Sequence, residues 1–125
     1  MSNVPVELKY TKDHEWIREK SSTTFQIGIT DFAQGALGDI VYIQLPKVGE
    51  VVKSGAVCGE VESTKSVSEI YSPLTGTITA VNPDLDNAPE LINHDPYGAG
   101  WIAEIEISGP TEELLTSEEY ETLTA

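Results

Sequence analysis

The chain has 125 residues, of which 39% are hydrophobic and 22% are charged, a balance typical of a folded protein and unlike that of disordered or fibrous chains. We expect one domain spanning residues 1–125 around a single core. Its 21 acidic and seven basic residues give a formal charge of −14, which argues against nucleic acid and anionic membranes as partners because both attract basic surfaces.

The start of the chain and its cysteine content bear on the cellular location of the protein and on the role of its thiol. Residues Met1 to Pro5 show neither the apolar core of a signal peptide nor an arginine-rich transit segment, and no apolar run approaches the roughly 18 residues needed to span a bilayer. We therefore expect a cytoplasmic, bacterial protein. The single cysteine, Cys58, cannot form an internal disulfide, and in its apolar stretch we expect it to pack as a small hydrophobic side chain rather than act as a nucleophile.

Short runs with alternating apolar and polar residues dominate the first half and the end of the chain. They predict half-buried strands at Thr24–Ile29, Val41–Leu45 and Trp101–Ile107. Between the first two, residues 31–37 predict a short helix, with Thr30 or Asp31 as its N-cap and a glycine at its end. We expect this helix to cover one side of a sheet.

From Leu45 onward the turn signals are closely spaced and predict hairpins. The strands expected here are Glu50–Lys53, Val57–Ser63, Ser66–Ser72 and Thr77–Val81. Residues 82–93 predict a loop with a helical turn over residues 89–92. The tail, residues 111–125, places leucines and a tyrosine on an acidic background and predicts one or two short C-terminal helices. The protein should be mainly β.

Lys65 lies in the turn between two of these predicted strands. Tight two-residue hairpins favour Asn-Gly or a similar pair because they need positive φ, whereas the pair here is Thr64-Lys65. Display of the lysine is the simplest reason for that choice. The plainer interpretation is a solvated turn lysine, and the residues alone favour it.

The surroundings of Lys65 resemble the lipoyl attachment region of the H proteins of the glycine cleavage system. The similar residues are Glu62-Ser63-Thr64-Lys65 and then Ser72-Pro73-Leu74-Thr75-Gly76, with Gly55 and Gly76 at nearly equal distances on either side of the lysine. The resemblance covers nearly the whole chain. Its other segments are Lys9-Tyr10, Asp13-His14-Glu15-Trp16, residues 27–34, residues 37–41, residues 45–49, Leu91-Ile92-Asn93, Pro96-Tyr97 and Gly100-Trp101.

This resemblance implies a mainly β barrel-sandwich hybrid of the lipoyl- and biotinyl-domain kind, with the short helix near residues 31–37 and short C-terminal helices. It also implies lipoate joined through an amide to Lys65 Nζ. The protein would then be a carrier and not an enzyme. A lipoyl-attaching enzyme would modify it, and we expect a monomer that docks on its partners through its acidic surface.

Three further partners follow from the same resemblance. A pyridoxal-phosphate glycine decarboxylase loads an aminomethyl group onto the arm, a tetrahydrofolate-dependent aminomethyltransferase removes it, and a flavin-dependent dihydrolipoyl dehydrogenase reoxidises the arm. The cargo carries a cationic amine, which carboxylates in a sheltered cleft would hold by charge-assisted hydrogen bonds. The resemblance makes Glu15 the first candidate for this role, with Asp13 and Glu69 as weaker ones. From the residues alone, each is a solvated surface carboxylate.

Other carriers fit less well. A biotinyl domain normally flanks its lysine with methionines, but the flanks here are Thr64 and Ser66. The lipoyl domain of a 2-oxoacid dehydrogenase complex usually has aspartate before the lysine and is shorter. A protein that relays lipoate to other lipoyl proteins would use the same Lys65, and the sequence leaves this alternative open.

A metal or hydrolytic site is not expected. The histidine-carboxylate pairs are His14-Glu15 and His94-Asp95. Adjacent residues on a strand point to opposite faces, and no cysteine or third histidine completes a metal-ligand set.

Overall fold

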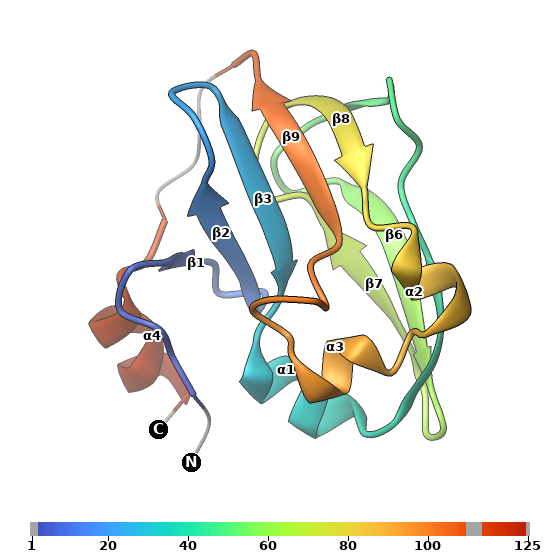
Figure 1. The fold of residues 1–125 in the computed structure, drawn as a ribbon. Helices are drawn as coiled ribbons and strands as arrows, with labels where there is room; N and C mark the ends of the chain where they lie inside the picture. The colour runs from blue at the N-terminus through green and yellow to red at the C-terminus, as the bar shows by residue number, and fades with distance from the viewer. Residues whose placement is uncertain (1–2, 110–113, 125) are drawn as a thin grey trace.

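The computed structural model describes residues 3–109 and 114–124 and contains two antiparallel sheets, shown in Figure 1. The larger has the strand order β1-β2-β3-β9-β8-β5 and the smaller β4-β6-β7. The strands are β1 (Lys9–Tyr10), β2 (Glu15–Glu19), β3 (Thr24–Ile29), β4 (Ile40–Gln44), β5 (Val51–Val52), β6 (Val57–Ser63), β7 (Val67–Tyr71), β8 (Gly76–Val81) and β9 (Ala103–Ile107). The helices are α1 (Asp31–Leu37), α2 (Asp84–Asn87), α3 (Leu91–His94) and α4 (Ser117–Thr124). This architecture confirms the expected mainly β, barrel-sandwich hybrid fold.

The two sheets share one apolar core. Strand β9 alternates buried and more exposed positions, and Ile105 is fully buried. On β6, Cys58 and Val61 are both buried although they are three residues apart. The pairing register with β7 shifts between Val57 and Gly59, and this irregularity returns both side chains to the core face. Within the described residues, no helix is long and apolar enough to cross a membrane.

The predicted helix at residues 31–37 is confirmed with the same bounds. Thr30 is its N-cap, with the Ala33 N–H donating to Thr30 Oγ1 at 3.2 Å, and Gly38 ends it at φ 86°. The predicted strands at residues 24–29 and 57–63 are also confirmed with their bounds.

Other elements differ from the prediction. Strand β9 begins at Ala103 rather than Trp101, β5 is only two residues long, and the helical turn near residue 90 is α3, preceded by α2. The described part of the tail holds one helix, α4; residues 110–113 and 125, which the prediction also covered, lie outside the described residues.

No predicted strand covered β2. Its first three residues, Glu15, Trp16 and Ile17, are all buried, so the strand shows no alternation. Ile17 faces the main core, whereas Trp16 belongs to a second cluster formed mainly by aromatic residues. A strand that is buried on both faces lacks the period-two pattern on which the prediction relied.

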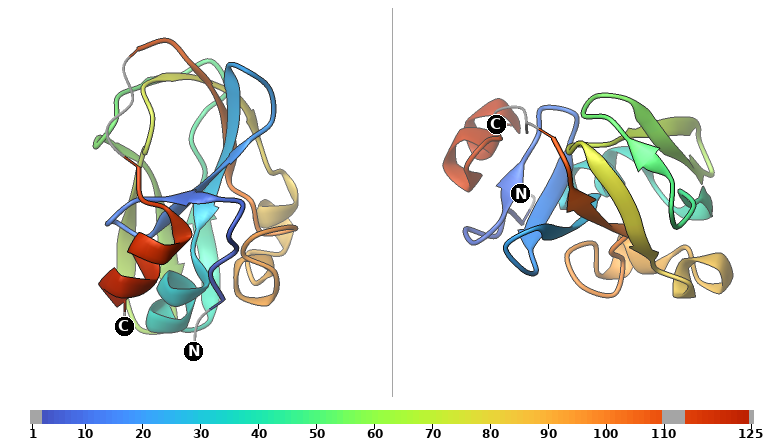
Figure 2. Two further views of the ribbon diagram at one scale, coloured as in Figure 1. Left: turned by 90° about the vertical axis from the view of Figure 1, so that its left-hand side faces the viewer. Right: turned by 90° about the horizontal axis from the view of Figure 1, so that it is seen from above.

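The second cluster holds the C-terminal segment against β1 (Figure 2). The rings of Tyr10 and Tyr120 stack with centroids 4.8 Å apart. The backbones of Tyr10 and Leu115 exchange hydrogen bonds of 2.9 and 2.7 Å. Helix α4 is therefore fixed to the N-terminal edge of the larger sheet by both ring stacking and backbone pairing.

Asn93 in α3 joins three segments. Its Oδ1 accepts from the Ile40 N–H at 2.8 Å, and its Nδ2 donates to the Gly38 carbonyl and to Gln34 Oε1, both at 2.9 Å. One side chain thus holds the end of α1 and the start of β4 on α3. The sequence resemblance included Asn93, but nothing in the sequence shows which backbone groups its amide contacts.

We predict that Asn93→Ala lowers the free energy of unfolding by about 2–3 kcal/mol, because it leaves a part-buried N–H and carbonyl without their partner. Urea unfolding at neutral pH measures the change. The control is His94→Ala at the neighbouring exposed residue, which should change stability by less than about 0.5 kcal/mol. Equal losses in the two variants would contradict this assignment.

Candidate functional site

The turn that carries Lys65 is built by the Ser63 side chain. Ser63 Oγ accepts from the Lys65 N–H at 3.2 Å and from the Ser66 N–H at 3.1 Å, and the Ser63 N–H donates to the Ser66 carbonyl at 2.8 Å. Three residues separate β6 from β7. Within the described residues His14 is the only non-glycine with positive φ, so the turn is not the two-residue type that the sequence suggested. This explains why Thr64 and Lys65 are accommodated without glycine or asparagine.

The loop after α1 lies against both the turn and the end of the Lys65 side chain. The Thr64 N–H donates to the Asp39 carbonyl at 3.0 Å. A Cβ atom at Gly38 would lie 3.2 Å from Lys65 Cε, and Gly38 has a φ of 86°. A side chain at position 38 would therefore both strain the backbone and push against the lysine. Lys65 itself is exposed. The β6–β7 hairpin that carries it reaches the end of the molecule where α1 and α3 also lie (Figure 1).

A cavity of about 180 Å³ lies between the N-terminal loop, α1 and the β6–β7 hairpin. Leu37, next to Gly38, is among its lining residues. Apolar side chains form most of the remaining wall, and all three predicted carboxylates reach it. The lining residues are Asp13, His14, Glu15, Ile29, Ala33, Ala36, Leu37, Val61, Ser68, Glu69 and Ile70. Residues from both sheets and from α1 thus meet at one hollow beside the hairpin.

Glu15 is the most unusual of these carboxylates, because only 3% of it is exposed. The Thr11 hydroxyl donates to Glu15 Oε1 at 2.7 Å. Burial raises the pKa of Glu15 to about 8; the charge of Asp13 adds to this, while hydrogen bonds from Thr11 and from the Tyr71 backbone oppose it. The interpretation of Glu15 as a solvated surface carboxylate is therefore wrong.

Asp13 and Glu69 are exposed, as expected for surface carboxylates. The Tyr71 hydroxyl donates to Glu69 Oε1 at 3.3 Å. Their position at the cavity wall lets them contribute charge without being buried. A cation in the cavity would thus meet one desolvated carboxylate and two at the rim.

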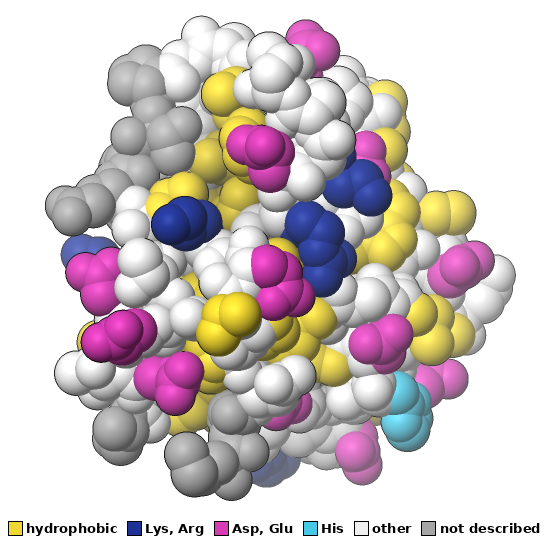
Figure 3. Space-filling view, turned by 60° about the vertical axis from the view of Figure 1, so that its left-hand side comes forward, with side chains coloured by type: hydrophobic (Ala, Val, Ile, Leu, Met, Phe, Trp, Pro, Cys, Tyr) yellow, Lys and Arg dark blue, Asp and Glu magenta, His cyan; other side chains and the backbone are white. Residues whose placement is uncertain are grey.

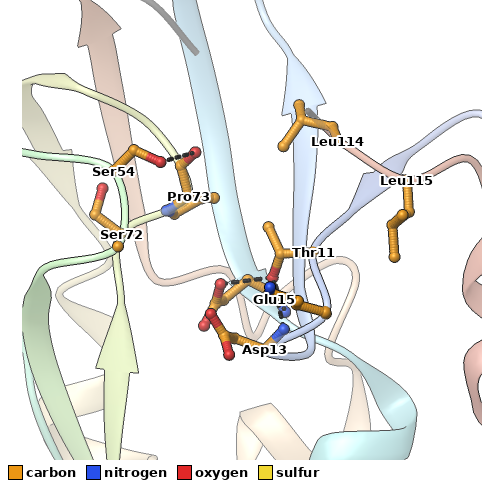
Figure 4. Close-up of a pocket in the computed structure, with 10 residues that line it drawn as sticks. Thr11, Asp13, Glu15, Ser54, Ser72, Pro73, Leu114 and Leu115 are labelled. Atoms are coloured by element: carbon orange, nitrogen blue, oxygen red, sulfur yellow. Dashed lines mark hydrogen bonds between the residues drawn. The ribbon is translucent and has the colours of Figure 1, made fainter. Parts of the chain in front are cut away.

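A second cavity, of about 310 Å³, lies on the other side of Glu15. Figure 4 shows Thr11, Asp13 and Glu15 facing Ser54, Ser72 and Pro73 across it, with Leu114 and Leu115 beyond Thr11 on the side away from Ser54. Asp13 and Glu15 line both cavities. The smaller cavity is the candidate site, because it is next to the glycine over which Lys65 passes and because its wall is largely apolar.

Among the described residues, neither Cys58 nor the potential metal ligands form a second site. Cys58 is buried, and burial raises the pKa of its thiol to about 12, which confirms the expectation that it packs as a hydrophobic side chain. Across residues 3–109 and 114–124, no cluster of three or more potential metal ligands occurs.

Comparison with known proteins identifies the family of the chain. The family model described as "Glycine cleavage H-protein" matches residues 8–125. The chain belongs to this family. A glycine cleavage system H protein from Mycobacterium avium is 56% identical over 108 residues, covering 86% of this chain and 82% of that protein, and one from Mycobacterium leprae is 54% identical over the same lengths. The crystal structure of the H protein from Mycobacterium marinum is similar with a TM-score of 0.90 at 44% identity, over 97% of this chain and 98% of that one.

As a glycine cleavage H protein, the chain is a lipoyl carrier of the glycine cleavage system and not itself a catalyst. The residues present fit a lipoyl group. Lys65 offers an exposed amine, Gly38 leaves room beside its methylenes, and the apolar cavity provides a sheltered surface for a hydrocarbon arm.

The raised pKa of Glu15 predicts how the free energy of unfolding depends on pH. Its pKa lies near 8 in the folded protein against an ordinary value of 4.5, so between these pH values the folded state binds more protons than the unfolded state. The free energy of unfolding therefore falls as the pH rises from about 4.5 to 8, because the buried Glu15 carboxyl resists losing its proton. Glu15→Gln removes this loss, and the variant should exceed the wild type by roughly 2–4 kcal/mol at pH 8 and by much less at pH 5.

Urea unfolding of both proteins at the two pH values measures this difference. Glu69→Gln at the exposed rim is the matched control and should follow the wild-type pH dependence. Parallel curves for wild type and Glu15→Gln would show that the Glu15 carboxylate is not desolvated in solution.

Proposed function

We propose that residues 1–125 act as one lipoyl-carrier domain with lipoate joined to Lys65 Nζ. The carrier takes the aminomethyl group of glycine from glycine decarboxylase to aminomethyltransferase, and dihydrolipoyl dehydrogenase then reoxidises it. The observation that carries this proposal is the pairing of an exposed, supported lysine with an adjacent apolar cavity that ends at a buried carboxylate. The lipoyl group supplies the sulfur chemistry that accepts and releases the one-carbon unit.

The chain's own residues have three tasks. Lys65 presents its amine to the lipoyl-attaching enzyme, and the Ser63 side chain holds the turn that carries Lys65. Ile29, Ala33 and Leu37 give the cavity an apolar surface that limits access of water to the cargo. Glu15 receives the cargo amine in a charge-assisted hydrogen bond, which is strong where the carboxylate is desolvated.

The buried Glu15 also bears on the choice between relay of lipoate and transport of a cationic cargo. A protein that only relays lipoate would need Lys65 but no site for a cation. A desolvated carboxylate in the cavity next to Gly38, over which the Lys65 side chain passes, favours a carrier whose cargo is positively charged. Relay of lipoate therefore remains the weaker alternative.

Charge complementarity supports docking on several enzymes in turn. The formal charge is −14, and Figure 3 shows acidic side chains spread over one face rather than gathered in a single patch. A field of one sign attracts basic surfaces over distances of about 8–10 Å at moderate ionic strength. A carrier that visits three partners benefits from such attraction, since it speeds encounters without tight binding.

The attachment site is tested by Lys65→Arg. Arginine keeps the positive charge but offers no amine for amide formation, so we expect the variant to gain no lipoyl mass, to abolish glycine cleavage and to unfold within about 0.5 kcal/mol of wild type. Intact mass after incubation with a lipoyl-attaching enzyme measures the modification. Lys47→Arg, at another exposed turn, should be lipoylated normally. Lipoylation of the Lys65 variant would reject the assignment.

The cargo site is tested by Glu15→Gln. This change keeps the shape and removes the charge, which should weaken the hold on the cargo amine by about 1–3 kcal/mol. We expect faster loss of formaldehyde and ammonia from the loaded protein once partner enzymes are removed, while lipoylation and reoxidation of the unloaded arm stay near normal. Glu69→Gln is the control and should have the smaller effect. Equal decay of wild type and Glu15→Gln would leave Glu15 with a structural role only.

A further inference from the structure

The residue before Glu15 has a backbone conformation that needs support. His14 has a φ of 69°, in the left-handed region that side chains other than glycine rarely adopt. Such a conformation persists only where surrounding contacts hold it. The His14 N–H donates to the Thr11 carbonyl at 3.1 Å, and the His14 carbonyl accepts from the Thr30 N–H at 3.0 Å.

The His14 side chain is held by the C-terminal helix. Its Nδ1 lies 2.8 Å from Tyr120 Oη, and the same oxygen lies 2.7 Å from Thr30 Oγ1. Tyr120 is fully buried and stacks on Tyr10, with an interplanar angle of 12°. The hydroxyl of Tyr120 is thus fixed by its ring, and it forms the centre of a network between His14 and Thr30.

This network joins the two walls of the smaller cavity. His14 and Glu15 belong to one wall. Helix α1 forms the other, and Thr30 is its N-cap. Burial raises the pKa of Tyr120, and the nearby charge of Glu15 adds to this, so the hydroxyl keeps its proton at neutral pH. One group on α4 therefore contacts both walls without lining the cavity.

We propose that Tyr120 is a positioning residue for the cargo site, whose hydroxyl, through His14 and Thr30, fixes the Glu15 carboxylate relative to α1. The proposal rests on the proposed function in that Glu15 is the group that holds the cargo amine. It gives the C-terminal helix a role at a site to which it contributes no lining residue. Figure 2 shows how α4 reaches this position from outside the larger sheet.

Two phenylalanine variants separate positioning from packing. Tyr120→Phe removes the hydroxyl and keeps the ring that stacks on Tyr10. Tyr10→Phe is the matched control, because it removes the hydroxyl of the other ring in the same stack, and that hydroxyl donates to the Pro5 carbonyl at 2.5 Å, outside the network. Both variants lose one tyrosine hydroxyl, but only one of them leaves His14 and Thr30 without their shared partner.

The first measurement uses the unloaded protein and follows the titration of the Glu15 carboxyl and the His14 imidazole by NMR. The exposed His94, the other of the two histidines, is an internal reference. We expect Tyr120→Phe to move both midpoints by about 0.5 pH unit or more, and Tyr10→Phe to leave them in place. Unchanged midpoints in Tyr120→Phe would overturn the proposal.

The second measurement follows decay of the cargo-loaded protein with partner enzymes removed. Tyr120→Phe should speed decay about threefold to tenfold, the range that the loss of one hydrogen bond covers, and Tyr10→Phe should not. Added to Glu15→Gln, the same change should have little further effect, because Tyr120 acts through Glu15. An undiminished effect in that background would overturn the proposal.

The outcomes distinguish this proposal from the proposed function. If Glu15→Gln speeds decay but Tyr120→Phe changes neither the Glu15 titration nor the decay, the cargo site is supported and the positioning role of Tyr120 is rejected. If Tyr120→Phe shifts the Glu15 titration but Glu15→Gln decays like wild type, Tyr120 does position Glu15, and the role of Glu15 in holding cargo falls.

Discussion

The burial of the Glu15 carboxylate is the constraint around which the site is organised. Only 3% of the residue is exposed, and the groups that oppose its raised pKa are a threonine hydroxyl and a backbone amide. Neither neutralises a negative charge, so the folded protein carries the cost of desolvating this group. Stability alone would favour a neutral side chain at the start of β2. A local feature that lowers stability in an otherwise well-packed fold is most simply explained by function.

The fold separates the two halves of the site and then brings them together. Lys65 lies on the hairpin of the three-stranded sheet, whereas Glu15 begins the second strand of the six-stranded sheet. Helix α1 follows β3 directly, and its final residues lie beside both the lysine and the cavity. Because Asn93 fixes the end of α1 and the start of β4, the distance between Lys65 and the Glu15 carboxylate is set by rigid elements.

Sequence patterns predicted the parts of this arrangement that depend on local periodicity. Residues 31–37 and 57–63 form the expected helix and strand, because the capping of the helix and the turn signals around the strand are encoded locally. Strand β2 was not predicted, because burial on both faces removes alternation. The resemblance to H proteins selected Glu15, Asp13 and Glu69, and all three reach one cavity. Burial of Glu15 and the contacts of Asn93 and Tyr120 depend on residues more than 50 positions apart, which no local pattern reports.

The raised pKa of Glu15 also lets its protonation state differ between an empty cavity and one that holds a cation. With a pKa of about 8, the carboxyl is mostly protonated at neutral pH when no cation is present, and a neutral acid is far less costly to bury than a bare charge. A cation entering the cavity favours the ionised form, so binding is coupled to release of a proton. The exposed Asp13 and Glu69 remain at the rim and add attraction without a comparable desolvation cost. The apolar wall therefore does more than exclude water, since under the proposed function it makes the charge of Glu15 depend on whether a cation occupies the cavity.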